Sequence, residues 1–324
     1  MAKITDMREI TINRYNGSDE AKSLWDSVVR EARNANFLHF RDFMDYHSHR
    51  FTDFSLFACY NGKPIAVLPA NISGSIVYSH QGLTYGGWLM TRRHCTGDVM
   101  LEVMDKSLEI MRQQGAKQLL YKPIPHIYKN YPADEDLYAL FRHGAKAASC
   151  GLSSAIALQA KRIPFDSNAK RALAASRKAK IEVKRSHDVE AFHSMLSQVL
   201  MQRHSVAPVH SIDELTLLMQ RFPHNIQLFM AFKEQRPVAG VVMFYGADVA
   251  HAQYIAANEE GRECGALAAL FDTLIQYAEF DGFRYFDFGI STENGGLSLT
   301  DGLNRQKCGF GGRGVVYESF LINL

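Results

Sequence analysis

The chain has 324 residues, of which 47% are hydrophobic and 22% charged, so two folded domains are expected rather than a disordered protein. A net charge of only +2 gives no reason to expect general affinity for nucleic acid, and no apolar run approaches the roughly 20 residues that cross a bilayer. The five cysteines form no C-x-x-C pair, which excludes a zinc ribbon and a disulfide scaffold. Residues 1–14 lack the apolar block of a signal peptide, so a cytoplasmic protein is expected.

Helices and strands are predicted to alternate along the chain. Ser18 is a suitable N-cap for the first helix, and Ser211 with Glu214 forms a capping box for a later one. Apolar residues at helical spacing predict further helices over residues 98–114, 136–147, 188–202 and 266–279. Apolar runs of strand length stand at residues 117–121, 152–158 and 283–288.

Two segments of the chain resemble each other. One begins at Leu56 and the other at Leu228; both open with Leu-Phe, turn at a basic residue followed by proline, and end in a strand with His and Gln. The two prolines, Pro64 and Pro237, are 173 residues apart. A helix and another strand follow in each case, so we expect a duplicated unit of helices and strands, with the boundary near residues 160–167.

Two cofactor motifs are excluded by their context. Gly309, Gly311 and Gly314 spell G-x-G-x-x-G, but a β-type run follows instead of the helix that a dinucleotide loop opens. Residues 287–289 spell the kinase motif D-F-G without a Gly-rich loop or a catalytic-loop signature. The 13 histidines lack the spacing of metal ligands, so no metal is expected.

Residues 258–265 lie between a predicted strand and a predicted helix. Gly261, Arg262 and Gly265 stand in this loop. Free amides at a helix N-terminus, together with the helix dipole, can hold a pyrophosphate. The alternative is a tight turn that binds nothing.

Basic residues gather between positions 170 and 185, where Glu182 is the only acid among them. The cluster includes Arg177 and Lys178. It predicts contact with a phosphorylated ligand, whereas the alternative is a solvated helix face.

Polar residues follow the predicted strand over 283–288. Asp287 stands near its end, where a carboxylate can accept a proton from an attacking amine, and Lys307 can offset developing negative charge. Glu293 and Gln306 belong to the same stretch. In the alternative interpretation a carboxylate caps the loop and the glycines make a turn.

Four stretches resemble a known family: Tyr78–Gly87, Arg177–Ala179, Phe286–Gly289 and Gln306–Gly312. The last is the most specific, because it is similar to an F-K-x-G-F-G-G stretch. On these residues the chain resembles the FemAB-like, GNAT-fold acyltransferases, particularly the bacterial group described as BioF-like or CelD-like acetyltransferase domains.

The resemblance implies an α+β fold of two tandem GNAT-like units, each a mixed twisted sheet flanked by helices. Residues 1–162 would form an acceptor-side unit and residues 163–324 a donor and catalytic unit, with a substrate cleft between or along them. The implied reaction is N-acyl transfer from an acyl-CoA, the favoured co-substrate, or an aminoacyl-tRNA. The implied partner is a small amine, such as an amino sugar or a phosphorylated cell-envelope precursor.

The resemblance also implies roles for single residues. Lys307 would meet donor phosphate or reaction-centre charge, and Arg177 with Lys178 would bind acceptor phosphates. The sequence departs from the family in two places. The stretch after Tyr78 lacks the carboxylate of the peptidoglycan-bridge enzymes, and Leu267 occupies the last small position of the usual CoA loop.

Our first hypothesis is therefore an N-acyltransferase. In it, the loop at Gly261, Arg262 and Gly265 holds donor phosphate, and backbone near Gln253 and Tyr254 orients the acyl carbonyl. Asp287 or His251 takes the proton of the amine. The residues expected on the acceptor side are Tyr85, His80, Gln81, Arg177, Lys178, Glu293 and Gln306. The alternatives are a non-catalytic module for a phosphorylated ligand and an aminoacyl-tRNA-dependent transferase.

Overall fold

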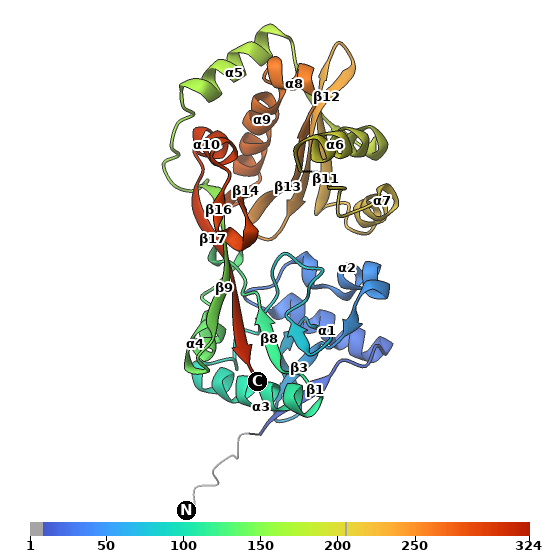
Figure 1. The fold of residues 1–324 in the computed structure, drawn as a ribbon, viewed down its shortest axis with the longest axis vertical. Coiled ribbons are helices and arrows are strands. Elements are labelled where there is room, and N and C mark those ends of the chain that lie inside the picture. Colours follow the sequence, from blue (N-terminus) through green and yellow to red (C-terminus); the bar gives the residue numbers. More distant parts are fainter. Residues whose placement is uncertain (1–8, 205) are drawn as a thin grey trace, which may run out of the picture. The chain divides into compact units, whose positions relative to one another are not determined.

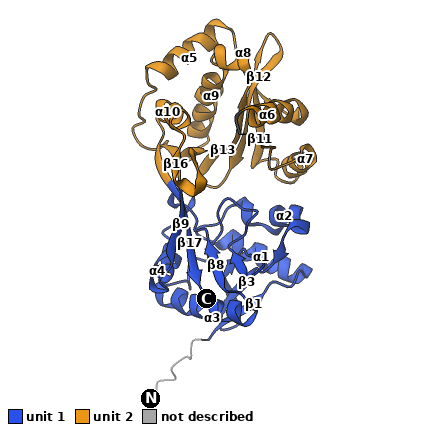
Figure 2. Cartoon of the chain, in the orientation of Figure 1, with its two compact units in different colours: residues 1–150, 316–324 blue, residues 151–315 orange. Residues whose placement is uncertain are grey.

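The computed structural model describes residues 9–204 and 206–324, and the chain divides into two compact units. Unit 1 comprises Met1–Cys150 with Val316–Leu324, and unit 2 comprises Gly151–Val315 (Figure 2). This division differs from the expected boundary at residue 162. The strand β9 (Lys146–Ala157) continues from one unit into the other, and the last strand, β17 (Arg313–Asn323), does so in the opposite direction.

Unit 1 combines two sets of strands with helices (Figure 1). Its strands are β1 (Ile10–Arg14), β2 (Thr52–Asp53), β3 (Leu56–Tyr60), β4 (Lys63–Leu68), β5 (Asn71–Ser73), β6 (Ile76–Tyr78), β7 (Leu89–Met90) and β8 (Gln118–Tyr121). Its helices are α1 (Asp19–Glu31), η1 (Phe37–His39), α2 (Arg41–Met44), η2 (Asp45–Arg50), α3 (Gly97–Gln113), η3 (His126–Tyr128) and α4 (Glu135–Arg142). One sheet has the order β1-β3-β4-β7, and β17 extends the row β8-β6-β5-β2.

Unit 2 has a sheet in the order β10-β11-β12-β13-β14-β9, with helices on both faces (Figure 1). Its further strands are β10 (Glu182–Ser186), β11 (Ile226–Lys233), β12 (Arg236–Tyr245), β13 (Val249–Ala257), β14 (Tyr285–Ile290), β15 (Thr292–Glu293) and β16 (Ser298–Leu299). Its helices are α5 (Ser167–Lys178), α6 (Val189–His204), α7 (Ile212–Arg221), α8 (Glu259–Glu263), α9 (Ala266–Phe280), η4 (Asn294–Gly296) and α10 (Asp301–Gly309).

The predicted duplication is confirmed by the local backbone. Asn61 and Gly62 join β3 to β4 with positive φ, and Glu234 and Gln235 join β11 to β12 in the same way. Two residues with positive φ are the mark of a type I′ hairpin. A β-bulge precedes each turn, after Ala58 in one unit and after Ala231 in the other, at the same offset of 173 residues.

Each unit also has a strand, a helix and a second strand that pairs parallel to the first. In unit 1, the short strand β7 and then α3 lie between β6 and β8, and β8 pairs parallel to β6. In unit 2, β13 is followed by α9 and by β14, which pairs parallel to β13. A right-handed crossover through a helix is the usual way to join such strands. The fold is therefore α+β, with two copies of one unit.

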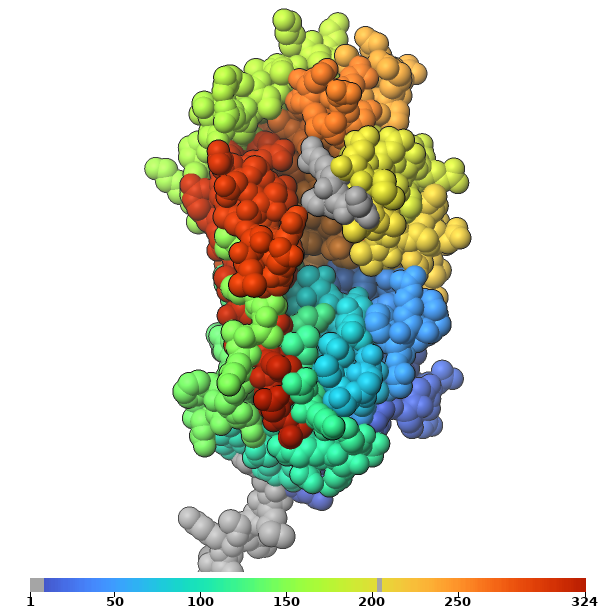
Figure 3. Space-filling view, viewed as in Figure 1, coloured from blue at the N-terminus to red at the C-terminus, as the bar shows by residue number. Residues whose placement is uncertain are grey.

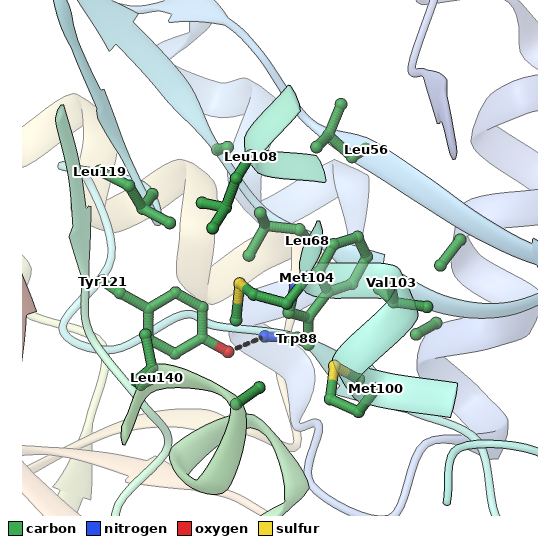
Figure 4. Packing of buried hydrophobic residues seen from close by; sticks show 14 of the residues in the cluster. Leu56, Leu68, Trp88, Met100, Val103, Met104, Leu108, Leu119, Tyr121 and Leu140 are labelled. Atoms are coloured by element: carbon green, nitrogen blue, oxygen red, sulfur yellow. Dashed lines mark hydrogen bonds between the residues drawn. The ribbon is translucent and has the colours of Figure 1, made fainter. Parts of the chain in front are cut away.

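Each unit has its own apolar core. In unit 1, α3 turns its stripe of Met100, Val103, Met104 and Leu108 onto Leu68 and Trp88 of the sheet side, as Figure 4 shows. The Tyr121 hydroxyl accepts a hydrogen bond from the Trp88 amide and donates one to Asp136 Oδ2. Burying one such large apolar side chain contributes roughly 1.5–3 kcal/mol, so the stripe adds several kcal/mol to the stability of this unit.

One predicted helix ends early. The helix expected over 136–147 stops at Arg142, because Gly144 (φ +66°) turns the chain and β9 begins at Lys146. The other predicted helices begin and end within about two residues of the observed ones, and both predicted caps, at Ser18 and Ser211, are confirmed.

Candidate active site

The parallel pairing of β13 and β14 stops within the strands. It joins Val249 to Tyr285, Ala250 to Phe286 and finally His251 to Asp287, although β13 continues to Ala257. Beyond His251, the edge of β13 that faces β14 is therefore no longer paired with β14. In unit 1 the parallel ladder joins Ile76–Tyr78 to Gln118–Leu120 and contains no pair of an imidazole and a carboxylate.

Asp287 is fully buried, and both of its carboxylate oxygens are hydrogen-bonded. Its Oδ2 lies 2.9 Å from His251 Nδ1. Its Oδ1 accepts from the Ser153 hydroxyl and, at 3.1 Å, from the Gly289 amide. A buried carboxylate is tolerated only when such donors replace its water. The His251 side chain keeps 13% of its surface exposed, so this imidazole connects the buried carboxylate to solvent.

A β-bulge in β13 sets the direction of the next side chains. Tyr254 pairs with Val242 and Ala252 with Met243, so Gln253 is the extra residue. Since side chains alternate along a strand, the bulge places His251 and Tyr254 on the same face of the sheet. The Tyr254 hydroxyl is hydrogen-bonded to His210 Nδ1, and burial raises its pKa to about 12.

Lys307 enters the same region from the last turn of α10. Its ammonium donates to the backbone carbonyls of Gly289 (2.8 Å) and Ile290 (2.7 Å), at the end of the strand that carries Asp287. Burial lowers the pKa of Lys307 to about 8, and the nearby Asp287 charge opposes that shift. The structure thus brings Asp287, His251 and Lys307 together, and α10 itself forms part of the surface (Figure 3).

The buried lysine gives unit 2 a pH-dependent stability. Its pKa is lower in the folded chain than the roughly 10.4 of an unfolded one, so the unfolded chain binds more protons between about pH 8 and pH 10.4. Stability must therefore rise with pH across that window. In that pH range we expect the free energy of unfolding of wild type to rise relative to that of Lys307→Met. The rise should be on the order of 1.4 kcal/mol per unit of pKa displacement.

Urea unfolding followed by far-UV circular dichroism at pH 7, 8, 9 and 10 measures this difference. Lys170→Met, which removes an exposed lysine from α5, is the matched control. Its free energy of unfolding should change with pH as that of wild type does, apart from a constant difference. Parallel curves for Lys307→Met and wild type would contradict the burial of the ammonium.

The loop predicted to hold an anion is a closely packed turn. The Gly261 amide donates to Asn258 Oδ1 and the Gly265 amide to the Arg262 carbonyl. Cβ atoms at the two glycines would lie 2.1 Å from the carbonyl oxygens of Val238 and Ala172. Both glycines are therefore required by packing, and their amides serve the turn.

The predicted basic cluster lies on the surface of α5 and β10. Lys170, Arg171, Arg177 and Lys178 are exposed on α5, which Figure 3 shows at the surface. Arg177 approaches Asp272 of α9 only to 4.0 Å, with most of its side chain in solvent. Glu293 of β15 and Gln306 of α10 are exposed as well.

The expected acceptor residues of unit 1 have partners within that unit. The Tyr85 hydroxyl accepts from Asn36 Nδ2 at 2.7 Å, and the Gln81 side chain accepts from Asn71 Nδ2 at 2.8 Å. His80 is buried in a turn with φ +66°, and burial lowers its pKa to about 3. His80 and His251, which correspond in the sequence repeat, thus differ in setting. The assignment of these residues to the acceptor stays a prediction.

Two contributors to the site escaped the sequence analysis. Ser153 comes from β9, 134 residues before its partner Asp287, and Gly289 belongs to the rejected D-F-G motif. The pair Ser153-Ser154 inside the apolar run of β9 was the available signal, because buried hydroxyls in such a run need a reason.

Within the described ranges, no three His, Cys, Asp or Glu side chains are grouped as ligands for a metal ion. Nor does any helix in residues 9–204 or 206–324 have the length and apolarity to cross a membrane.

Comparison with known proteins agrees with this geometry. Residues 165–294 match the family model described as "Acetyltransferase (GNAT) domain", which covers most of unit 2. Residues 165–294 therefore form a GNAT domain. A search of curated proteins finds no match.

Solved structures extend the GNAT likeness to both units. FemX is 12% identical over 96% of this chain and 97% of its own, with a TM-score of 0.68. L-PGS from Bacillus licheniformis is 13% identical over 95% and 92%, with a TM-score of 0.61. A tandem GNAT protein from the clavulanic acid biosynthesis pathway is 10% identical over 97% and 98%, with a TM-score of 0.53. The tandem, FemAB-like GNAT fold expected from the sequence is confirmed.

Proposed function

We propose that unit 2 transfers an acyl group from an acyl-CoA to the amine of a small acceptor. The observation that carries the proposal is the His251–Asp287 pair at the point where β13 and β14 stop pairing. A partly exposed imidazole that is hydrogen-bonded to a buried carboxylate is suited to general-base catalysis. The parallel ladder of unit 1, which joins Ile76–Tyr78 to Gln118–Leu120, contains no such pair, and this favours unit 2 as the catalytic unit.

The amine would lose its proton to His251. With Nδ1–H donating to Asp287 Oδ2, Nε2 carries the lone pair that accepts that proton. The amine nitrogen then bonds to the thioester carbon, the carbon–sulfur bond breaks, and the CoA thiolate leaves with the electron pair. Asp287 keeps the imidazole in the required tautomer and stabilises its charged form.

The donor would lie along the free edge of β13. Beyond His251 this edge has no pairing with β14, and an extended chain such as pantetheine can add to an open strand edge. The bulge at Gln253 interrupts the ladder, so backbone near Gln253 and Tyr254 would orient the acyl carbonyl. Lys307, near the end of β14, would supply positive charge as the carbonyl oxygen becomes negative.

Donor phosphates would lie at the start of α9. The first amides of a helix have no partner within the helix, and the dipole favours an anion there. Since the amides of Gly261 and Gly265 are used in the turn, those of Ala266 and Leu267, with the exposed Arg262, are the proposed contacts. Arg177 and Lys178, at the end of α5, are proposed to meet an anionic group of the acceptor.

A second donor, aminoacyl-tRNA, is favoured by a different observation. The turn at Gly261 and Gly265 is closely packed, while basic side chains on α5 and β10 are exposed. A row of cations with few acids is suited to a phosphate backbone.

Thiol release tests the proposal. A panel of acyl-CoA donors is combined with amine acceptors that include amino sugars and phosphorylated amines, and free thiol is followed with a colorimetric reagent. We expect amine-dependent release with at least one donor. No release with any acyl-CoA, together with transfer from a labelled aminoacyl-tRNA, would replace the first donor by the second.

A further inference from the structure

Ser153 stands in the interior of unit 2, on the strand next to β14. Its side chain is fully buried, and its hydroxyl donates to Asp287 Oδ1. It belongs to the run Leu152 to Ala157 of β9, in which all residues other than Ser153 and Ser154 are apolar. A hydroxyl in such surroundings needs a partner, and here the partner is the carboxylate of the catalytic pair.

An irregularity in β14 aims Ser153 at this carboxylate. Asp287 lies opposite Ala155 and Ile290 lies opposite Ser153, so β14 contains one residue more than β9 over this stretch. Gly289 (φ +77°) allows the bulge and turns its own amide onto Oδ1. A Cβ at this position would lie 3.5 Å from His251 Cε1. The bulge thus delivers two donors to one oxygen of Asp287.

The two oxygens of Asp287 therefore have separate tasks. Oδ1 accepts from Ser153 and Gly289, whereas Oδ2 faces His251 Nδ1. We propose that Ser153 is a positioning residue for acyl transfer: by holding Oδ1, it keeps Oδ2 on Nδ1–H of His251, so that Nε2 carries the lone pair that takes the proton of the amine. This inference rests on the proposed function, in which His251 is the base.

Hydrogen bonds to an ionised group are stronger than those between neutral groups. Without the hydroxyl, Oδ1 would lose one of its donors, and the carboxylate could rotate away from His251. The neighbouring Ser154 provides a contrast. Its hydroxyl is equally buried but has no hydrogen-bond partner in the described part of the chain, so it plays no part in holding Asp287.

Three variants test the proposal: Ser153→Ala, Ser153→Thr and the matched control Ser154→Ala. We expect Ser153→Ala to lower kcat by about tenfold, a fraction of the 10²–10⁴ that a complete base supplies, with KM for both substrates unchanged. Ser153→Thr keeps the hydroxyl and should stay within about threefold of wild type. Ser154→Ala should leave kcat unchanged.

The tautomer of His251 gives a readout that needs no substrate. Nitrogen-15 shifts of the labelled ring should show the proton on Nδ1 in wild type and in Ser154→Ala. In Ser153→Ala, we expect part of the population to move to Nε2–H. If wild type releases no thiol from any acyl-CoA, the proposed donor is wrong, and the ring shifts still decide the role of Ser153.

Two results would overturn the inference. One is a ring spectrum of Ser153→Ala that is identical to that of Ser154→Ala. The other is a loss of activity that falls on KM or that Ser153→Thr fails to restore, because a purely structural serine would behave in that way.

Discussion

His251→Gln is expected to lower kcat by a factor of about 10²–10⁴, the usual contribution of a general base. Glutamine can still donate to Asp287 Oδ2, 2.9 Å from the present Nδ1, so the buried carboxylate keeps a partner and the fold is retained. It cannot accept the proton of the amine. The measurement is single-turnover acyl transfer at saturating donor and acceptor, with whichever donor the panel identifies.

His224→Gln is the control, because His224 is exposed in the turn between α7 and β11 and belongs to neither β13 nor β14. It should keep wild-type activity. A His251→Gln protein that retains activity within about threefold of wild type would remove His251 from the reaction and, with it, the proposed mechanism.

Gly265→Ala is expected to lower the free energy of unfolding by about 2–5 kcal/mol. Gly265 caps α9 with φ +72°, a conformation that costs other residues about 1–2 kcal/mol. In addition, the new Cβ would lie 2.1 Å from the Ala172 carbonyl oxygen. Because backbone cannot yield as a side chain does, α5 must shift, at a further cost of about 1–3 kcal/mol.

Gly282→Ala separates the two contributions. Gly282 follows the other end of α9 with φ +84°, but a Cβ there meets no atom within 4 Å. It should cost only the conformational 1–2 kcal/mol, roughly. Chemical unfolding by far-UV circular dichroism compares the two variants. Equal losses would show that the contact between α5 and the start of α9 is looser than described.

Local signals predicted most of the fold. The apolar stripes fixed the ends of α3 and α9 to within a residue or two, and the repeated turn at Pro64 and Pro237 revealed the duplication. These features depend on short stretches of chain, where spacing decides the structure. The end of α4 was missed, since Gly144 outweighs the apolar residues that continue into β9.

The site was harder to predict, because its members come from separate strands. Asp287 and Lys307 were identified from the polar stretch after β14, and His251 was named as an alternative base. That Asp287 and His251 lie side by side became clear only from the pairing of β13 with β14. The contact of Ser153 with Asp287 depends on the bulge in β14 opposite β9, and no local sequence pattern predicts that bulge. At Gly261 the sequence predicted an anion site, and that site stays a prediction; the structure adds that close packing against β12 also requires this glycine.

Hydrogen exchange with and without a non-hydrolysable acyl-CoA analogue tests the central claim most directly, namely that the donor lies where β13 leaves β14. We expect the analogue to protect amides of β13 beyond His251, residues 252–257, and those at the start of α9. Protection confined to residues 9–150, or none at saturating analogue, would contradict the assignment of the donor to unit 2.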